Sequence, residues 1–307
     1  MNKTRNFGSR VAVDFRRNKL KYLMALPVLI ILIIFCYKPM YGILIAFKRY
    51  RPTLGIADSP WVGLEYFKQF FADPYCGRLF RNTLTISILS LLLEFPAPII
   101  FALLLNEVKL KKFKKTVQTV SYIPHFISTV VVCGMISSFC ASDGLFNNIA
   151  VLFGAERSNL LLEKNNFYPI YIISNIWKGL GWNSIIYLAA LSGIDQEQYE
   201  AARIDGANRI QQMFHITLPG IMPTVSMLLI LRIGSLLSVG YEKIILLYQP
   251  TTYAVADVIS SYVYRRGLQS GEFSYGTAIG LFNSIVNIIL LLIANRTSKK
   301  LGQSGLF

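Results

Sequence analysis

The chain has 307 residues, of which 53% are hydrophobic and only 15% are charged, and its mean hydropathy is positive. A soluble domain carries roughly 25% charged residues, so this composition indicates a polytopic membrane protein without a separate soluble domain. The net charge of +15 could indicate a nucleic-acid partner, but the basic residues cluster in short segments beside apolar stretches. That pattern is typical of membrane topology and of contact with anionic lipid heads, so we expect a surrounding lipid bilayer and no nucleic acid.

The cysteines and histidines form no pattern that carries chemistry. The four cysteines make no CxxC pair and no metal-ligand spacing. His125 and His215 lie far apart and belong to no HExxH motif. A Gly-x-x-x-x-Gly-Lys-Ser/Thr loop for ATP phosphates is also missing from the sequence. The sequence therefore predicts no catalytic residue, no metal site and no cofactor bound by this chain.

A basic tail at residues 1–21 precedes the first apolar run, at residues 22–47. A basic start before an apolar core resembles a signal peptide. This run is too long for a signal-peptide core, however, and Lys38-Pro39 stands where a small-residue cleavage site would be expected. We therefore expect an uncleaved first transmembrane helix with its N-terminus in the cytoplasm.

Five further apolar stretches predict transmembrane helices, at residues 82–105, 117–140, 168–191, 221–239 and 275–294. The short loop 106–116 between the second and the third is rich in lysine: Lys109, Lys111, Lys112, Lys114 and Lys115. Such a loop is typical of the cytoplasmic side. We therefore predict an all-α domain of six transmembrane helices over residues 22–295, with both termini in the cytoplasm and a C-terminal tail at 296–307. Pro96 and Pro98 predict a kink or break in the second helix, beside Glu94.

Polar residues concentrate in the fourth and fifth predicted helices. Asn175, Gly179 and Trp182 are spaced four and three apart, which places them on one helical face. An amide, a glycine and an aromatic ring suit a sugar, because they provide hydrogen bonds, close approach and stacking. The alternative is helix packing by small and polar residues, which is common in membranes.

Arg232 lies in the predicted fifth helix, where a charge costs roughly 2.5–3.5 kcal/mol on insertion scales. An ion pair with Glu94 or Glu242 could offset that cost. Alternatively, Arg232 faces the transport pathway and meets an acidic solute, with Ser235 three residues on along the same face.

The segment 192–220 is an unusually polar interval between the fourth and fifth helices. It reads Tyr199-Glu-Ala-Ala-Arg-Ile-Asp-Gly-Ala207, then Phe214-His-Ile-Thr-Leu-Pro219 and Pro223. This closely resembles the EAA loop of permease subunits in binding-protein-dependent ABC importers. The resemblance implies the type I ABC importer permease (MetI-like) fold and a short coupling helix that docks on a cytoplasmic ATPase. The coupling residues that it implies are Glu200, Ala201, Ala202, Asp205, Gly206, Ala207, Leu218 and Pro219.

Further matches resemble the oligosaccharide and polysaccharide branch, often called LplB-like permeases. They include Phe35-Cys-Tyr-Lys-Pro39, Ser59-Pro-Trp61-Val-Gly63, Tyr248-Gln-Pro250 and Tyr262-Val-Tyr264-Arg265. By resemblance to maltose-type permeases, the family's Asn-x-Trp-x-Gly pattern falls on Asn175, Trp177 and Gly179. The expected substrate-binding residues are Asn175, Gly179, Trp182, Arg232 and Ser235. A family serine position falls on Leu228, which is a departure from that pattern. Arginine replaces a neutral amide at 232, so the expected solute is an acidic, uronate-containing oligosaccharide.

The resemblance also implies partners and a location. We expect a second permease subunit, two ATPase subunits that use ATP and Mg²⁺, and an extracytoplasmic solute-binding protein, all at the cell membrane of a prokaryote. Two alternatives are a membrane-embedded enzyme acting on lipid-linked sugars and a stand-alone secondary transporter. The first would need carboxylates or histidines clustered at one interface, and the second would show repeats of broken helices with a coupling-ion site.

Overall fold

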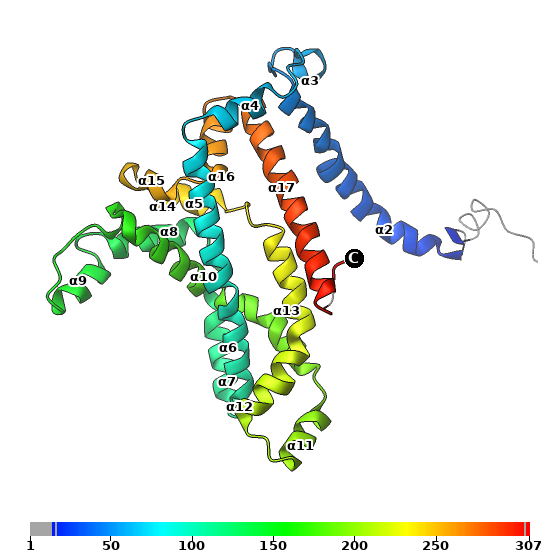
Figure 1. Cartoon of the computed structure of the whole chain (residues 1–307), viewed down its shortest axis with the longest axis vertical. Coiled ribbons are helices and arrows are strands. Elements are labelled where there is room, and N and C mark those ends of the chain that lie inside the picture. The colour runs from blue at the N-terminus through cyan, green and yellow to red at the C-terminus, as the bar shows by residue number, and fades with distance from the viewer. Residues whose placement is uncertain (1–13, 16, 304) are drawn as a thin grey trace, which may run out of the picture.

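The computed structural model describes residues 14, 15, 17–303 and 305–307, and this part of the chain contains helices and two isolated β-bridges but no strand. Five of its helical stretches are long and apolar enough to cross a membrane: Lys19–Phe47, Cys76–Glu107, Thr129–Leu152, Arg209–Ile233 and Phe273–Lys300. Another long helix, α10 (Lys164–Ser192), packs along α6, α7 and α13 and is less apolar. The long helices form an elongated bundle (Figure 1), so the predicted all-α polytopic fold is confirmed.

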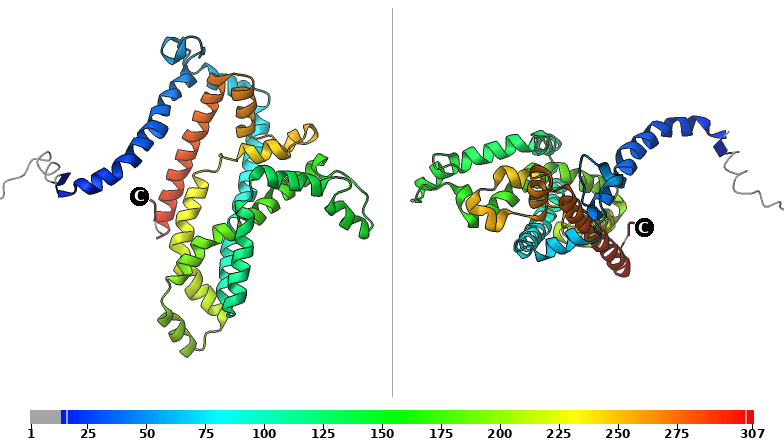
Figure 2. Two further views of the ribbon diagram at one scale, coloured as in Figure 1. Left: turned by 180° about the vertical axis from the view of Figure 1, so that it is seen from behind. Right: turned by 90° about the horizontal axis from the view of Figure 1, so that it is seen from above.

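The first stretch stands apart from the bundle. It consists of α2 (Lys19–Leu32), a π-helical turn (Ile33–Tyr37) and a 3-10 segment (Lys38–Phe47). α2 has no buried residue and leans away from the other helices, while the 3-10 segment packs against α17 (Figures 1 and 2). Most of the predicted basic tail, residues 1–13 and 16, lies outside the described residues. Two short helices follow, α3 (Gly55–Asp58) and α4 (Glu65–Ala72).

The second stretch stays helical through its prolines, with one π-helical turn before them. It comprises α5 (Cys76–Leu89), a π-helical turn (Ser90–Glu94) and α6 (Pro96–Glu107). Proline has no backbone N–H, so regular helical bonding is lost here. The N–H of Phe95 instead bonds to the carbonyl of Ser90 at 3.1 Å, five residues back. Glu94 is the last residue of this turn, and it lines two cavities.

The single helix predicted at 117–140 is wrong. The segment is divided into α7 (Lys111–Tyr122), a 3-10 turn (Ile123–Phe126) and α8 (Thr129–Cys140). The backbone of Ile127 and Ser128 is extended, and the Ser128 hydroxyl caps α8 by accepting from the N–H of Val131. α8 therefore takes its own direction and continues into an arm with α9 (Leu145–Leu152) and a short 3-10 turn (Leu160–Leu162) (Figure 1).

α7 and α10 approach each other closely at Gly181. A Cβ at this position would lie 2.2 Å from the carbonyl oxygen of Ser121, so a larger residue would force the helices apart. This contact fixes α10 beside the break that follows α7.

The fifth helix ends earlier than predicted. α13 (Leu218–Ile233) stops at Gly234, and residues up to 240 form turns rather than the expected helix to 239. The next segment lies between the fifth and sixth predicted helices, and the predicted topology places it outside the membrane. It folds into α14 (Tyr241–Leu247), α15 (Tyr253–Ala256), α16 (Ile259–Val263), a 3-10 turn (Pro250–Thr252) and a π-helical turn (Tyr264–Gln269). α14 packs against α8, and its Lys243, Ile244 and Leu247 are buried.

An ion pair helps to hold this segment together. Asp257 is fully buried, and both of its carboxylate oxygens accept from Arg265, at 2.7 and 2.9 Å. The last helix, α17 (Phe273–Lys300), extends beyond the predicted end at 294, so the basic residues of the predicted C-terminal tail occupy its last turns. At the other end of α17, buried apolar side chains from its first turns and from α4, α5 and α16 form a separate part of the core.

The EAA-like segment lies at the end of the bundle opposite α3 and α4 (Figure 1). It contains α11 (Gln196–Ile204), α12 (Arg209–Gln212) and a π-helical turn (Met213–Thr217) that leads into α13. Where α13 begins, one core of buried side chains from α6, α10 and α13 packs against Leu218 and so connects this loop to the cavity-lining helices.

Candidate functional site

Two cavities inside the bundle share the side chains of Glu94, Arg232 and Ser235. The smaller, of about 130 Å³, is also lined by Ile86, Ser87, Ser90, Tyr171, Asn175, Leu236, Ser238, Val239 and Gly240. The larger, of about 480 Å³, is also lined by Phe95, Pro98, Trp182, Asn183, Ile186, Tyr187, Leu228 and Leu231. Pro98 and Leu228 lie nearer the EAA-like loop than residues 236–240 do. The larger cavity therefore extends towards that loop and the smaller one towards the opposite end, with the three shared side chains between them.

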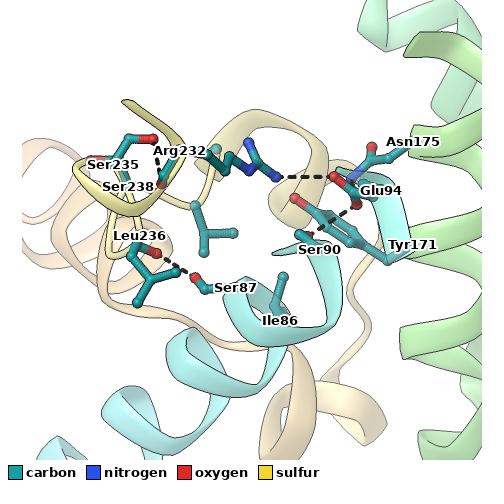
Figure 3. A pocket seen from close by; sticks show the side chains of 12 residues that line it. Ile86, Ser87, Ser90, Glu94, Tyr171, Asn175, Arg232, Ser235, Leu236 and Ser238 are labelled. Atoms are coloured by element: carbon teal, nitrogen blue, oxygen red, sulfur yellow. Dashed lines mark hydrogen bonds and ion pairs between the residues drawn. The ribbon is translucent and has the colours of Figure 1, made fainter. Parts of the chain in front are cut away.

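An ion pair stands where the two cavities meet. Nη2 of Arg232, from the last turn of α13, lies 3.1 Å from Oε2 of Glu94, from the π-helical turn before α6 (Figure 3). Their side chains are 44% and 15% exposed, respectively. Of the two partners considered for Arg232, Glu94 is the one found, and the arginine nevertheless lines both cavities. An ion pair and a place on the pathway are therefore compatible for this residue.

The second carboxylate oxygen of Glu94 is held by neutral donors. Oε1 accepts from Nδ2 of Asn175 at 2.8 Å and from the hydroxyl of Ser90 at 3.1 Å. Figure 3 shows these side chains converging on Glu94 from α10 and from the π-helical turn. The carboxylate is thereby fixed from two directions, once by the cation and once by neutral hydrogen bonds.

Lys243 extends this network and was not predicted. Its Nζ donates to the carbonyl of Tyr171 at 3.1 Å, to the hydroxyl of Ser174 at 2.7 Å and to Oδ1 of Asn175. These three acceptors satisfy all three donors of a protonated lysine. Burial lowers the pKa of Lys243 to about 8. The one signal in the sequence was a lysine directly before the apolar run Ile244-Ile-Leu-Leu247.

The three residues predicted on one face of α10 take different places. Asn175 lines the smaller cavity and Trp182 lines the larger one, whereas Gly179 lines neither. A Cβ at Gly179 would lie 2.9 Å from Nδ2 of Asn183, so the glycine makes room for a residue of the larger cavity. One face of the Trp182 ring stacks on His125, with centroids 4.4 Å apart and planes 3° from parallel.

Ser235, a predicted solute contact, and Leu228, the departure from the family pattern, both line a cavity. The Ser235 hydroxyl donates to the carbonyls of Leu231 and Arg232 and lines both cavities. Leu228 lines the larger cavity, where its apolar side chain stands in place of the serine of the family pattern. In the described residues no group of three or more histidine, cysteine or acidic side chains could hold a metal ion.

The EAA-like loop is a separate, surface-exposed feature. Asp195 caps α11 by accepting from the N–H of Glu197, and the helix ends at Asp205. Gly206 then adopts φ +81°, a left-handed conformation that favours glycine. The N–H of Ala207 closes the turn on the carbonyl of Ala202 at 2.8 Å.

The predicted coupling residues divide into two groups. Glu200, Ala201 and Ala202 lie on α11 and Asp205, Gly206 and Ala207 form its terminal turn, whereas Leu218 and Pro219 begin α13. Leu218 packs against the core of α6, α10 and α13, so it supports the loop from inside. The surface of the loop exposes three large apolar side chains, Ile204, Ile210 and Phe214. Tyr199 ties α11 to Thr217 through a 3.0 Å hydroxyl hydrogen bond.

A membrane helix bundle with two cavities lined by charged and polar side chains, and with an exposed loop at one end, is an arrangement expected of a transport component. Residues 94–302 match the family described as the inner membrane component of binding-protein-dependent transport systems, and the chain belongs to this family.

Relatives and solved structures agree along nearly the whole chain. The polygalacturonan/rhamnogalacturonan transport system permease protein YteP of Bacillus subtilis is 47% identical over 97% of this chain and 93% of its own. Protein LplB of the same organism is 48% identical over 95% and 92%. A subunit in the crystal structure of a bacterial ABC transporter that imports the acidic polysaccharide alginate is 47% identical, with a TM-score of 0.88 over 95% of this chain and 99% of that chain. In a second structure, the alginate transporter in complex with an alginate pentasaccharide-bound periplasmic protein, the match is 46% identical with a TM-score of 0.89.

Proposed function

We propose that the chain is the transmembrane permease subunit of an ATP-driven importer for acidic oligosaccharides. The observation that carries the acidic solute is Arg232, which is 44% exposed and lines both internal cavities although it belongs to a membrane helix. A charged side chain in a membrane helix has a high free-energy cost of insertion, so it is expected to mark a solute or ion pathway. Names of similar proteins support the same class of solute, because they refer to polygalacturonan and to alginate.

The other cavity residues fit a sugar. Asn175 and Ser235 offer hydrogen-bonding groups, and Trp182 presents an aromatic ring in the wall of the larger cavity. Pyranose rings combine hydroxyl groups with apolar faces, so polar groups beside one aromatic wall recognise both parts. In this assignment the uronate carboxylate meets Arg232 and the sugar ring contacts Trp182.

Energy for transport comes from a partner in this proposal. α11 and its Asp205-Gly206-Ala207 turn form the coupling element, and the exposed Ile204 and Ile210 beside them give an apolar surface for a cytoplasmic ATPase. ATP and Mg²⁺ are used by two such ATPase subunits. A second permease completes the pathway, an extracytoplasmic binding protein delivers the solute, and both termini of this chain lie in the cytoplasm.

The proposal is tested by binding two matched solutes to the purified complex of permeases and ATPases without the binding protein. The solutes are trigalacturonate and its fully methyl-esterified form, which differ in charge but share the same rings. A hydrogen bond to a charged group contributes about 1.5–3 kcal/mol, so Arg232→Asn should weaken trigalacturonate binding about tenfold or more. The methyl ester should bind equally well to both proteins.

Arg296→Asn is the matched control, since it removes an exposed arginine from the end of α17. It should leave both affinities unchanged. An equal preference of the wild-type protein for the two solutes, or a preference that survives in Arg232→Asn, would overturn the acidic-solute proposal.

A further inference from the structure

Glu94 is already paired with Arg232, the arginine that a solute uronate would need. Its Oε2 lies 3.1 Å from Nη2 of Arg232, in the wall shared by both cavities. A solute carboxylate in either cavity therefore meets a guanidinium that is paired with a carboxylate of the protein. The arrangement raises the question of whether the two carboxylates can exchange.

The contact between the two side chains is one-pronged. Among the described residues the guanidinium of Arg232 donates only through Nη2, to one oxygen of Glu94. Arginine has five N–H donors and commonly binds carboxylates through two at once. Arg232 therefore keeps donors that can engage an incoming carboxylate before the contact to Glu94 is lost.

Glu94 does not depend on Arg232 alone. Its other oxygen accepts from Asn175 at 2.8 Å and from Ser90 at 3.1 Å, and Asn175 is in turn fixed by Lys243. When Arg232 turns towards a solute, these neutral donors keep the Glu94 carboxylate solvated by hydrogen bonds. The cost of stranding a buried charge is thereby reduced.

The charges of the network are not balanced. Arg232 and Lys243 each carry a positive charge, and Glu94 supplies the one negative charge in their hydrogen-bonded chain. Lys178, which donates to Thr129 at 3.0 Å, adds another nearby cation on α10. One carboxylate of an anionic solute would bring the Arg232–Glu94–Lys243 chain to neutrality, whereas a neutral sugar would leave its excess positive charge in place.

We infer that Glu94 is an internal counter-ion, which holds Arg232 while the cavity is empty and yields it to the carboxylate of the solute. This inference rests on the proposed acidic-oligosaccharide function and adds a specificity-determining residue to it. A neutral sugar cannot replace Glu94 at the guanidinium, so the ion pair between the two cavities stays intact. An acidic sugar breaks the ion pair, and the competing Glu94 later helps to release the solute.

The test uses the same purified complex and the same two solutes, trigalacturonate and its methyl ester. Glu94→Gln removes the competing charge but keeps the size of the side chain, so trigalacturonate should bind about tenfold more tightly, as removal of one charged hydrogen bond allows. Methyl-ester binding should not change. In reconstituted vesicles with the binding protein, the turnover of trigalacturonate should fall because release is slowed.

Three comparisons separate this role from a purely structural one. Glu107→Gln, at the exposed end of α6, is the matched control and should change nothing. In the Arg232→Asn background, Glu94→Gln should lose its effect on trigalacturonate. Glu94→Asp, which keeps the charge but shortens its reach, should tighten binding by less than Glu94→Gln and provides a readout if the glutamine variant does not assemble.

Unchanged or weaker trigalacturonate binding in Glu94→Gln, with the charge preference still abolished by Arg232→Asn, would overturn the counter-ion role and leave the proposed function intact. Equal binding of trigalacturonate and its ester by the wild-type protein would instead refute the proposed function itself.

Discussion

A substitution of Gly206 directly tests the proposed coupling element, which consists of α11 and its terminal turn. The φ of Gly206, +81°, lies in the left-handed region, and no described heavy atom outside residues 205–207 lies within 4 Å of a Cβ added there. Gly206→Ala therefore perturbs the backbone without a clash. A left-handed conformation costs an L-residue roughly 1–2 kcal/mol, which corresponds to about a 5- to 30-fold change in an equilibrium. Asparagine tolerates this region better than alanine, so Gly206→Asn should retain more of the wild-type turn.

The assay is ATP hydrolysis and solute uptake by the complete importer in proteoliposomes, reported as solute moved per ATP. We expect the ratio to decrease in the order wild type, Gly206→Asn, Gly206→Ala and Gly206→Trp, since tryptophan adds bulk to the exposed surface as well as strain. Gly193→Ala is the control within the same loop, because φ of Gly193 is −88°. Normal uptake by Gly206→Trp would refute a coupling role for this turn.

Three further predictions concern the interior of the bundle. Asp257→Asn removes the charge from a fully buried carboxylate and strands Arg265, which should lower the free energy of unfolding by about 3 kcal/mol; an unchanged melting temperature in detergent would contradict it. Lys243 has a pKa of about 8 when folded and 10.5 as its ordinary value, so the unfolded chain binds more protons between these values and stability should rise with pH across that window. The rise should be smaller in Lys243→Met, and an equal change of melting temperature with pH in the two proteins from pH 7.5 to 9.5 would contradict the lowered pKa of Lys243. Trp182→Ala should weaken trigalacturonate and its methyl ester by the same factor, about two- to tenfold, whereas a loss confined to one solute would exclude a stacking role.

Hydropathy predicted the helical class and most of the long helices, because a bilayer requires runs of apolar residues. It could not show the break after α7, since the residues around Ile127 and Ser128 continue the apolar run while the backbone turns extended. It also missed where helices end. α13 stops at Gly234 within an apolar stretch. α17 continues past residue 294, where its apolar run ends, and includes the polar residues up to Lys300.

Sequence reasoning selected Arg232 as a charge in an apolar helix and Asn175 on one face of the more polar fourth helix, and it named Glu94 as a possible partner of the arginine. In the structure these three side chains form one hydrogen-bonded network in the wall of the smaller cavity. Lys243 was missed because its segment contains several charges and was assigned to the exterior, whereas in the structure α14 folds back against α8 and its lysine reaches α10. Such tertiary contacts depend on how a segment packs and leave no periodic signal in its own sequence.

In the proposed function, this chain moves an acidic oligosaccharide only when a separate ATPase drives its coupling loop. Uptake of labelled trigalacturonate should be measured in proteoliposomes that contain the complete importer, with the binding protein on one side and ATP on the other. We expect uptake that requires hydrolysable ATP and the ATPase subunits and that is lost in Gly206→Trp. Equal uptake by this chain without the ATPase subunits, or uptake unaffected by a non-hydrolysable ATP analogue, would contradict it.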